Sequence, residues 1–306
     1  MRHSFAQVDE WRKLGFVQLP GFFASAEISP LVIDFESLYP KQDGEAIEGI
    51  AKEVKKDGQI GATHPRQFLN IDTLPYNGSS ALNLISMHPA LIALAKDLLG
   101  VRKVHLYQSH TWAKFTGEAD YDQAFHCDFG NHTLTVPSDL EAARTVDFIV
   151  YLTDVTDDLG ALHYVTKPDA YSVLGNGSIS VPESKQKALQ EYEKSAAGPS
   201  GTVLAHGIDT FHRGTNLVER NGKRYTMTIG YKAAGNEMIG FHVWQAAADR
   251  SWDTIIEHGT PEQLEVLGIP RPGDTFWSHR TLELTQKRWP NWNMTSYFRA
   301  VEKRQL

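Results

Sequence analysis

The sequence predicts a mainly β fold, a sandwich or barrel, with flanking helices at both ends of the chain. Short segments rich in β-branched and aromatic residues follow one another through its middle. Turn-rich pieces such as TDDLG and ERNGK separate these segments. A parallel sheet would need a crossover helix after each strand, and this alternation is not visible, so a sandwich or barrel is favoured.

The first hundred residues favour helices. Helices are expected over residues 8–14, after Ser25, which can cap its helix, and over residues 80–99, with a break near Pro89 and an end at Gly100. Residues 15–23 are strand-like, although a proline interrupts them.

The strands begin near residue 104. They are expected over residues 104–115, 124–129, 146–155, 161–166, 202–206, 210–215 and 224–233, with a helix inserted over residues 182–197. After Gly235 the chain is again helical and rich in tryptophan, which either forms a lid over the site or packs outside the barrel. One domain is expected, with a helical part over about 1–100, a core over about 101–234 and a helical extension over about 235–306.

The composition is that of a folded globular protein, since 41% of the 306 residues are hydrophobic and 22% are charged. The net charge of -7 and the lack of a dense Lys/Arg run argue against a nucleic-acid partner. The N-terminus does not resemble a secretory signal, and no apolar run of membrane-spanning length is expected. Cys127 is the single cysteine, so no internal disulfide can form. A cytoplasmic protein without a membrane partner is therefore expected.

His126 and Asp128 lie two residues apart in the strand-like segment AFHCDF. Alternate side chains of a strand leave the same face, so both can bind one metal ion while Cys127 points the other way. Alone, this pair is a weak signal, because solvated polar residues at the edge of a strand give the same pattern.

A second element, FHRGTN at residues 211–216, places His212 at the start of a tight glycine turn, ahead of a strand that opens with Arg224. Two histidines and one carboxylate on one face of an octahedral ion leave three positions open, which suits Fe(II) oxygen chemistry. A closed tetrahedral zinc site needs a fourth ligand, and none is placed for it. His126, Asp128 and His212 are therefore the candidate metal ligands.

Arg224, Thr226 and Thr228 alternate with apolar residues along the last strand, so one of its faces is polar. We interpret this face as the interior of the barrel. An arginine there needs a permanent anion, because an unpaired buried charge is unfavourable. A dicarboxylate co-substrate that reaches the metal with its other end meets this need. An ordinary ion pair is the alternative.

These motifs resemble those of the phytanoyl-CoA dioxygenase family of Fe(II)- and 2-oxoglutarate-dependent oxygenases, including its ectoine hydroxylase relatives. The resemblance covers about residues 15–231 and includes the HxD pair at His126, the H-R-G-x-N-like turn from His212 and the arginine a dozen residues later. GFVQLPGFF, HPALIALAKDLLG and DLGALHYV match more softly. The P-G-S-H that usually follows the last of these is replaced by TKPD, which leaves the next loop without a counterpart.

The resemblance implies a double-stranded β-helix, that is, a cupin-like jelly roll. The implied contacts are His126, Asp128 and His212 for Fe(II), Arg224 and Thr226 for the C5 carboxylate of 2-oxoglutarate, and Gln108 and Lys114 as further candidates for the pocket or 2-oxoglutarate. The implied reaction consumes O2 and 2-oxoglutarate, releases succinate and CO2, and oxidises, most simply hydroxylates, a small organic metabolite. A monomer or a homodimer is expected.

Other functions stay open. An acyl-thioester hydroxylase would need basic residues near the pocket mouth to meet the CoA phosphates, and no such cluster is evident in the sequence. A metal-binding jelly roll without redox activity, either an isomerase or a ligand-binding module, would not need Arg224. His206 lies outside the glycine turn and is set aside as a ligand, while His110, His132 and His163 are expected to be structural or to orient the substrate.

Overall fold

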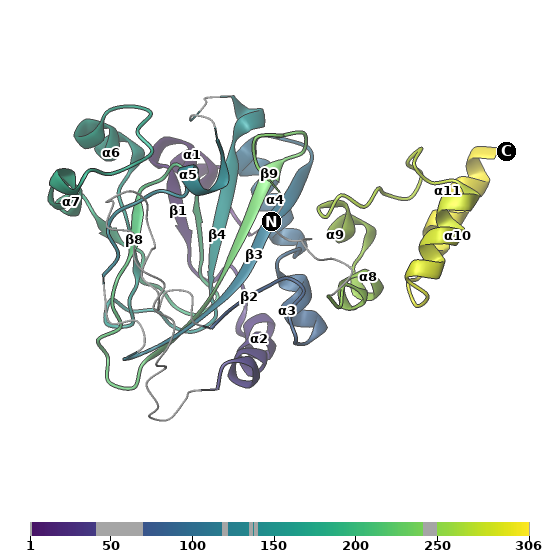
Figure 1. Cartoon of the computed structure of the whole chain (residues 1–306), viewed down its shortest axis with the longest axis horizontal. Coiled ribbons are helices and arrows are strands. Elements are labelled where there is room, and N and C mark those ends of the chain that lie inside the picture. Colours follow the sequence, from purple (N-terminus) through teal and green to yellow (C-terminus); the bar gives the residue numbers. More distant parts are fainter. Residues whose placement is uncertain are drawn as a thin grey trace.

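The structure, a computed structural model, describes residues 2–40, 70–117, 122–134, 137, 140–240 and 250–305. Two antiparallel sheets form its centre (Figure 1). The main sheet has the order β1-β7-β4-β9-β3-β2 and consists of β1 (Phe16–Leu19), β2 (Ile71–Thr73), β3 (Val104–Phe115), β4 (Thr145–Tyr151), β7 (Val203–His206) and β9 (Lys223–Ala233). The small sheet has the order β6-β5-β8 and consists of β5 (Leu162–Tyr164), β6 (Lys194–Ser195) and β8 (His212–Gly214). The predicted mainly β fold with flanking helices is confirmed.

The main sheet has an apolar and a more polar face, because side chains alternate along each strand. β3 and β9 pair along nearly their whole length, with one bulge between Leu106 and Gln108. On β9, Thr226 lies opposite Tyr151 of β4 and shares its face. The polar side of β9 therefore faces away from the apolar core that lies on the other side of the sheet.

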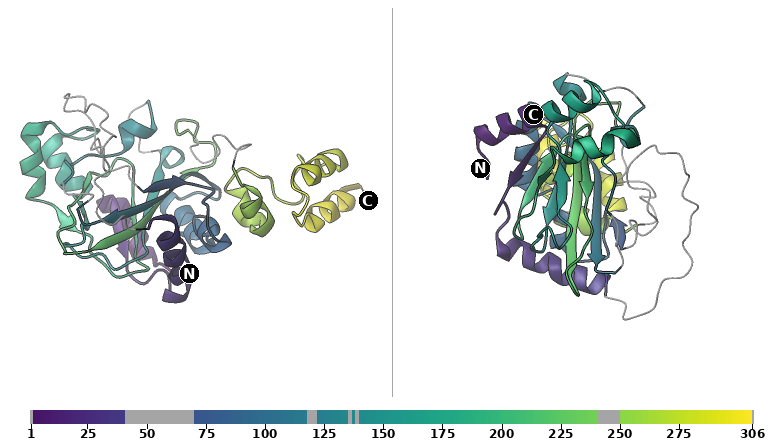
Figure 2. Two further views of the ribbon diagram at one scale, coloured as in Figure 1. Left: turned by 60° about the horizontal axis from the view of Figure 1, so that its bottom comes forward. Right: turned by 90° about the vertical axis from the view of Figure 1, so that its left-hand side faces the viewer.

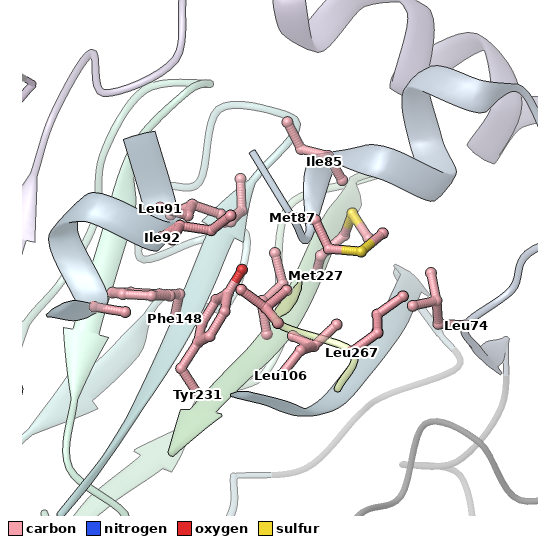
Figure 3. Packing of buried hydrophobic residues seen from close by; sticks show 14 of the residues in the cluster. Leu74, Ile85, Met87, Leu91, Ile92, Leu106, Phe148, Met227, Tyr231 and Leu267 are labelled. Atoms are coloured by element: carbon pink, nitrogen blue, oxygen red, sulfur yellow. The ribbon is translucent and has the colours of Figure 1, made fainter. Parts of the chain in front are cut away.

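Helices cover the apolar face of the main sheet. They are α2 (Ser25–Leu38), α3 (Ser80–Ile85) and α4 (Pro89–Leu99). Figure 3 shows Phe148, Met227 and Tyr231 of the sheet packed near Leu91 and Ile92 of α4, all of them buried. Burial of a Leu, Ile, Phe or Met side chain contributes about 1.5–3 kcal/mol, so this layer holds the sheet while its other face stays available for a site.

Most helix boundaries in this part follow their sequence signals. Pro89 begins α4 and Gly100, in the left-handed region at φ 72°, ends it, as predicted. Ser25 differs from its prediction, because it is the first helical residue and not the cap. Instead, the Glu27 carboxylate accepts a hydrogen bond of 2.9 Å from the Ala24 N–H.

The segment Ser80–Leu99 is long and apolar enough to cross a membrane by length and composition, contrary to the expectation from the sequence. In the fold it is divided into α3 and α4, and 61% of its most apolar stretch is buried inside the protein. Packing against the sheet accounts for its apolar character.

The C-terminal part is helical, as predicted. Its helices are α8 (Asp253–His258), α9 (Pro261–Glu265), α10 (His279–Arg288) and α11 (Thr295–Gln305). Trp252, Trp277 and Trp292 are all buried in the main hydrophobic cluster, and Trp277 and Trp292, which flank α10 in the sequence, pack around Tyr297 of α11. Figures 1 and 2 place α10 and α11 at the end of the molecule opposite the small sheet. These described tryptophans therefore form no lid over the site, and Trp244 lies outside the described residues.

Among the predicted elements, two differ most from the structure. Residues 124–129 form no regular strand, because His126 makes a single β-bridge and α5 (Phe129–His132) starts directly after Asp128. The helix predicted over residues 182–197 is the shorter α7 (Glu183–Gln190), which β6 follows.

The TKPD segment is a helix start. Thr166 caps α6 (Lys167–Leu174) by accepting a hydrogen bond from the Asp169 N–H at 3.2 Å, and a proline stands in the first turn. The segment whose loop had no counterpart in the sequence comparison therefore begins a helix. α6 and α7 lie beside the small sheet (Figure 1).

Candidate metal centre

Two backbone hydrogen bonds join the segments that carry His126 and His212. The His126 N–H donates to the His212 carbonyl at 3.0 Å, and the His212 N–H donates to the His126 carbonyl at 2.8 Å. This antiparallel bridge makes the two residues direct cross-strand neighbours whose side chains leave the same face. Their ring centroids lie 4.6 Å apart.

Each imidazole has one nitrogen held by a backbone carbonyl. His126 Nδ1 lies 2.9 Å from the Ala124 oxygen, and His212 Nδ1 lies 3.0 Å from the Thr210 oxygen. Only a protonated ring nitrogen can donate to a carbonyl, so these contacts place a proton on each Nδ1 and make Nε2 the nitrogen of each ring that can face a metal ion. Histidines that bind metals are commonly oriented in this way.

Asp128 joins the histidines from a helical turn. Asp128 caps α5, and its backbone angles, φ -84° and ψ 0°, are helical and not extended, so the expectation that strand alternation aligns it with His126 is wrong. Its Oδ2 nevertheless lies 3.7 Å from His212 Nε2. One ligand atom from each of the three residues lies within 4.8 Å of the other two. Cys127 is buried in an apolar cluster that includes Phe125 and Phe129.

The donor set fits a divalent metal. Burial lowers the pKa of His126, and the neighbouring His212 lowers it further. Burial alone would raise the pKa of Asp128, but the surrounding histidines hold this pKa below its ordinary value. A neutral His126 imidazole and an ionised carboxylate are the forms that bind a metal ion. Two histidines and one carboxylate leave coordination positions open for further ligands.

The inward face of β9 carries the predicted cationic group. Arg224 is 7% exposed and lies opposite Lys114 in the register of β3 and β9. Burial, together with the charge of Arg224, lowers the pKa of Lys114 to about 7. Thr226 is the next inward residue, with Trp112 and Tyr151 on the neighbouring strands. This wall offers a planar cation, an amine and a hydroxyl to an anion.

Gly160, in the DLGALHYV segment, allows Arg224 to lie where it does. It has φ 75°, and a Cβ atom there would lie 2.8 Å from Arg224 Nη1 and 2.6 Å from the Thr215 carbonyl oxygen. A larger residue would therefore displace the guanidinium as well as strain the backbone.

A buried polar cluster that was not predicted from the sequence adjoins the three ligands. Asp147, on β4, accepts hydrogen bonds from the Tyr107 hydroxyl at 2.7 and 2.9 Å and from the Gln108 amide at 3.0 Å. Burial raises the pKa of Asp147 to about 7, and the charge of Asp128 adds to the effect. Gln108, a predicted pocket contact, thus lies in this cluster. The only signal in the sequence was an acid among the apolar residues of VDFIV.

His206 lies closer to the site than its place in the sequence suggests. It is opposite Asp147 in the register of β4 and β7, and its ring centroid lies 4.9 Å from that of His212. Burial and the neighbouring His212 lower the pKa of His206 to about 3, so its imidazole is neutral.

The other candidate histidines occupy different surroundings. His132 Nδ1 lies 3.0 Å from the Tyr107 hydroxyl, at the edge of the polar cluster. His110 lies on β3, opposite Thr228. His163 faces away from the site, where its Nδ1 lies 3.1 Å from a Glu193 carboxylate oxygen.

A cleft of about 600 Å³ opens at this end of the main sheet. Its lining includes Phe129 and Thr145. Phe129 is the residue after the candidate ligand Asp128, and Thr145 begins β4. The charged residues of the lining are Arg12, Lys13, Arg144, Lys167, Glu141 and Asp209. The four cations come from three separate segments, which is why no basic cluster is evident in the sequence.

Three solved structures illustrate the folds to which this chain is similar. SnoN, described as a non-haem α-ketoglutarate-dependent epimerase from nogalamycin biosynthesis, is 17% identical with a TM-score of 0.54, covering 75% of this chain and 82% of SnoN. SnoK, described as a carbocyclase from the same biosynthesis, is 17% identical with a TM-score of 0.52, covering 76% and 85%. EctD from S. alaskensis is 18% identical with a TM-score of 0.55, covering 79% and 83%.

No protein-family model matches the sequence, and no curated protein matches it. At these identities the likeness to solved structures defines the class of fold. The chain has a cupin-like jelly roll, a double-stranded β-helix, as expected from the sequence.

Alanine at His126, Asp128 or His212 is expected to weaken Fe(II) binding at this site by more than about tenfold, because even the loss of a group that supports a ligand weakens metal binding 10–100-fold. Anaerobic titration and the iron content of the folded protein measure the effect. His163→Ala is the matched control and should bind iron as the wild type does. Wild-type affinity in all three ligand variants would contradict the assignment.

Proposed function

We propose that this chain is an Fe(II)- and 2-oxoglutarate-dependent dioxygenase of the phytanoyl-CoA dioxygenase type that oxidises a small organic metabolite. The observation that carries the proposal is the convergence of His126, Asp128 and His212 within a jelly roll whose inward face also holds the buried Arg224. SnoN, which has a similar fold, is described in complex with Fe3+ and α-ketoglutarate. A jelly roll that only binds a metal ion would not require the cations Arg224 and Lys114 beside the metal ligands.

The residues divide the work between the two ends of 2-oxoglutarate. The three ligands would hold Fe(II), which supplies the activation of O2 when it is bound. Arg224 and Lys114 would bind the far carboxylate, and the Thr226 hydroxyl would donate to it. One oxygen atom of O2 enters succinate as CO2 is lost, and the other is available to the substrate. Arg224 is buried and Lys114 is half-buried, which would limit the access of water to this end of the site.

Hydroxylation is the simplest outcome of this chemistry and is the one that we propose. SnoN and SnoK are described as an epimerase and a carbocyclase, so this fold also accommodates other outcomes. The test is a metabolite screen with Fe(II), 2-oxoglutarate and O2, scored by succinate release. A product heavier by one oxygen indicates hydroxylation, whereas the loss of two hydrogens indicates desaturation or cyclisation.

Arg224→Met is expected to raise the KM for 2-oxoglutarate at least about thirtyfold, which corresponds to the loss of about 2 kcal/mol from a buried charge pair. Succinate formation at increasing 2-oxoglutarate concentration measures it. Arg220, exposed in the turn before β9, provides the control, and Arg220→Met should keep the wild-type KM. Equal KM values in the two variants would remove the role assigned to Arg224.

The affinity for 2-oxoglutarate is expected to fall as the pH rises above about 7. The pKa of Lys114 lies at about 7, so the amine is charged below this pH and neutral above it. Above pH 7 the Lys114 amine must be protonated when the carboxylate binds, and this proton uptake weakens the affinity by at most about tenfold per pH unit. Titration calorimetry from pH 6 to 9, a range of about three units, should show this slope in the wild type and its loss in Lys114→Met. A slope that persists in the variant would exclude Lys114.

The cleft favours one second candidate, an acyl-thioester hydroxylase of the same chemistry. Arg12 and Lys13 are exposed on α1 (Phe5–Leu14) at its rim, where phosphate groups could reach them. If an acyl-CoA is the substrate, Arg12→Ala/Lys13→Ala should raise its KM at least about tenfold at low salt, while a short thioester of the same acyl group is unaffected. If no acyl-CoA increases succinate release over the substrate-free rate, this candidate is eliminated.

A further inference from the structure

Asp147 and His206 form a second group of metal-ligating side chains beside the first. They are direct neighbours across β4 and β7, and each is 1% exposed. One ligand atom each from Asp128, Asp147 and His206 lies within 4.8 Å of the other two. Asp128 therefore belongs to both groups, and a carboxylate has two oxygens with which to bind two ions.

The Asp147 carboxylate is held in place by its neighbours. It accepts the three contacts from the Tyr107 hydroxyl and the Gln108 amide described above, and an ionised carboxylate has room for about four. Carboxylates that bind metals are usually oriented by such hydrogen bonds. The cluster thus leaves Asp147 able to accept one more partner.

The surroundings of His206 give separate evidence for a ligand at this place. Its Nδ1 lies 3.2 Å from the Tyr164 hydroxyl, whereas its Nε2 is buried and has no hydrogen-bond partner among the described residues. A buried imidazole nitrogen without a partner is unfavourable. A metal ion between this ring and the two carboxylates would occupy the nitrogen and neutralise the acids at once.

We propose that Asp128, Asp147 and His206 form a second divalent-cation site, which shares Asp128 with the first. One nitrogen and two carboxylate oxygens suit a first-row divalent ion such as Mn(II) or Fe(II). Ions that share a carboxylate in two-metal sites lie about 3.5–4 Å apart. The inference rests on the proposed role of Asp128 as an iron ligand, and it adds a second ion to the single one of the proposed function.

The test counts Mn(II), used alone as the probe, on the folded full chain by equilibrium dialysis, with electron paramagnetic resonance to detect coupling between ions. The wild type should bind two ions with a coupled signal. Asp147→Asn and His206→Leu should each bind one uncoupled ion. Asp154→Asn, on an exposed loop, and His163→Leu are the matched controls and should bind two. Circular dichroism and the Tm confirm that each variant is folded.

The outcomes separate this inference from the proposed function. Loss of one ion in His126→Ala, with the second retained, supports two sites. A single ion in the wild type that His126→Ala abolishes would overturn the second site and leave the proposed function standing. Full occupancy by two ions in both Asp147→Asn and His206→Leu would also overturn it. If the wild type binds no Mn(II), both proposals fail.

Discussion

The candidate site depends on two hydrogen bonds between the backbones of His126 and His212. They bring together segments that are far apart in the sequence and make their imidazoles neighbours on one face. The carbonyls of Ala124 and Thr210 then orient the rings, and the turn that begins α5 adds the Asp128 carboxylate. Backbone geometry, rather than contacts among the side chains themselves, therefore sets the direction of each ligand, so the site is organised before a metal binds.

The two faces of the main sheet have different roles, because one packs into the hydrophobic core and the other carries the candidate site. The face covered by α2, α3 and α4 is apolar and supplies the core, whereas the opposite face carries Arg224, Lys114 and Asp147. A buried charge such as that of Arg224 is unfavourable unless a partner compensates it. The cations lie toward one end of β9 and the acids toward the other, so a molecule with a carboxylate at the cationic end and a metal-binding group at the other matches the charge pattern of this face.

Much of this arrangement could be predicted from the sequence. The strands around Trp112 and Thr226 were predicted nearly to their ends, because β-branched and aromatic residues alternate there with polar ones. The HxD pair and the H-R-G-x-N turn identified three residues that the structure brings together. Asp128 was correctly predicted to lie beside His126, but for the wrong reason, because the helical turn of α5 and not a β-strand brings its carboxylate there. β2, α6 and the cluster around Asp147 were missed, because short elements and long-range contacts such as Asp147 with His206 leave no local pattern.

The central claim is that three side chains hold one iron ion and that 2-oxoglutarate bridges this ion and the cationic wall. A crystal structure of the protein grown anaerobically with Fe(II) and 2-oxoglutarate, with anomalous diffraction recorded at the iron edge, tests it most directly. The account predicts an iron peak within bonding distance of His126 Nε2, His212 Nε2 and an Asp128 oxygen, and a keto acid whose far carboxylate meets Arg224. Iron bound elsewhere, or a 2-oxoglutarate that does not reach Arg224, would contradict it.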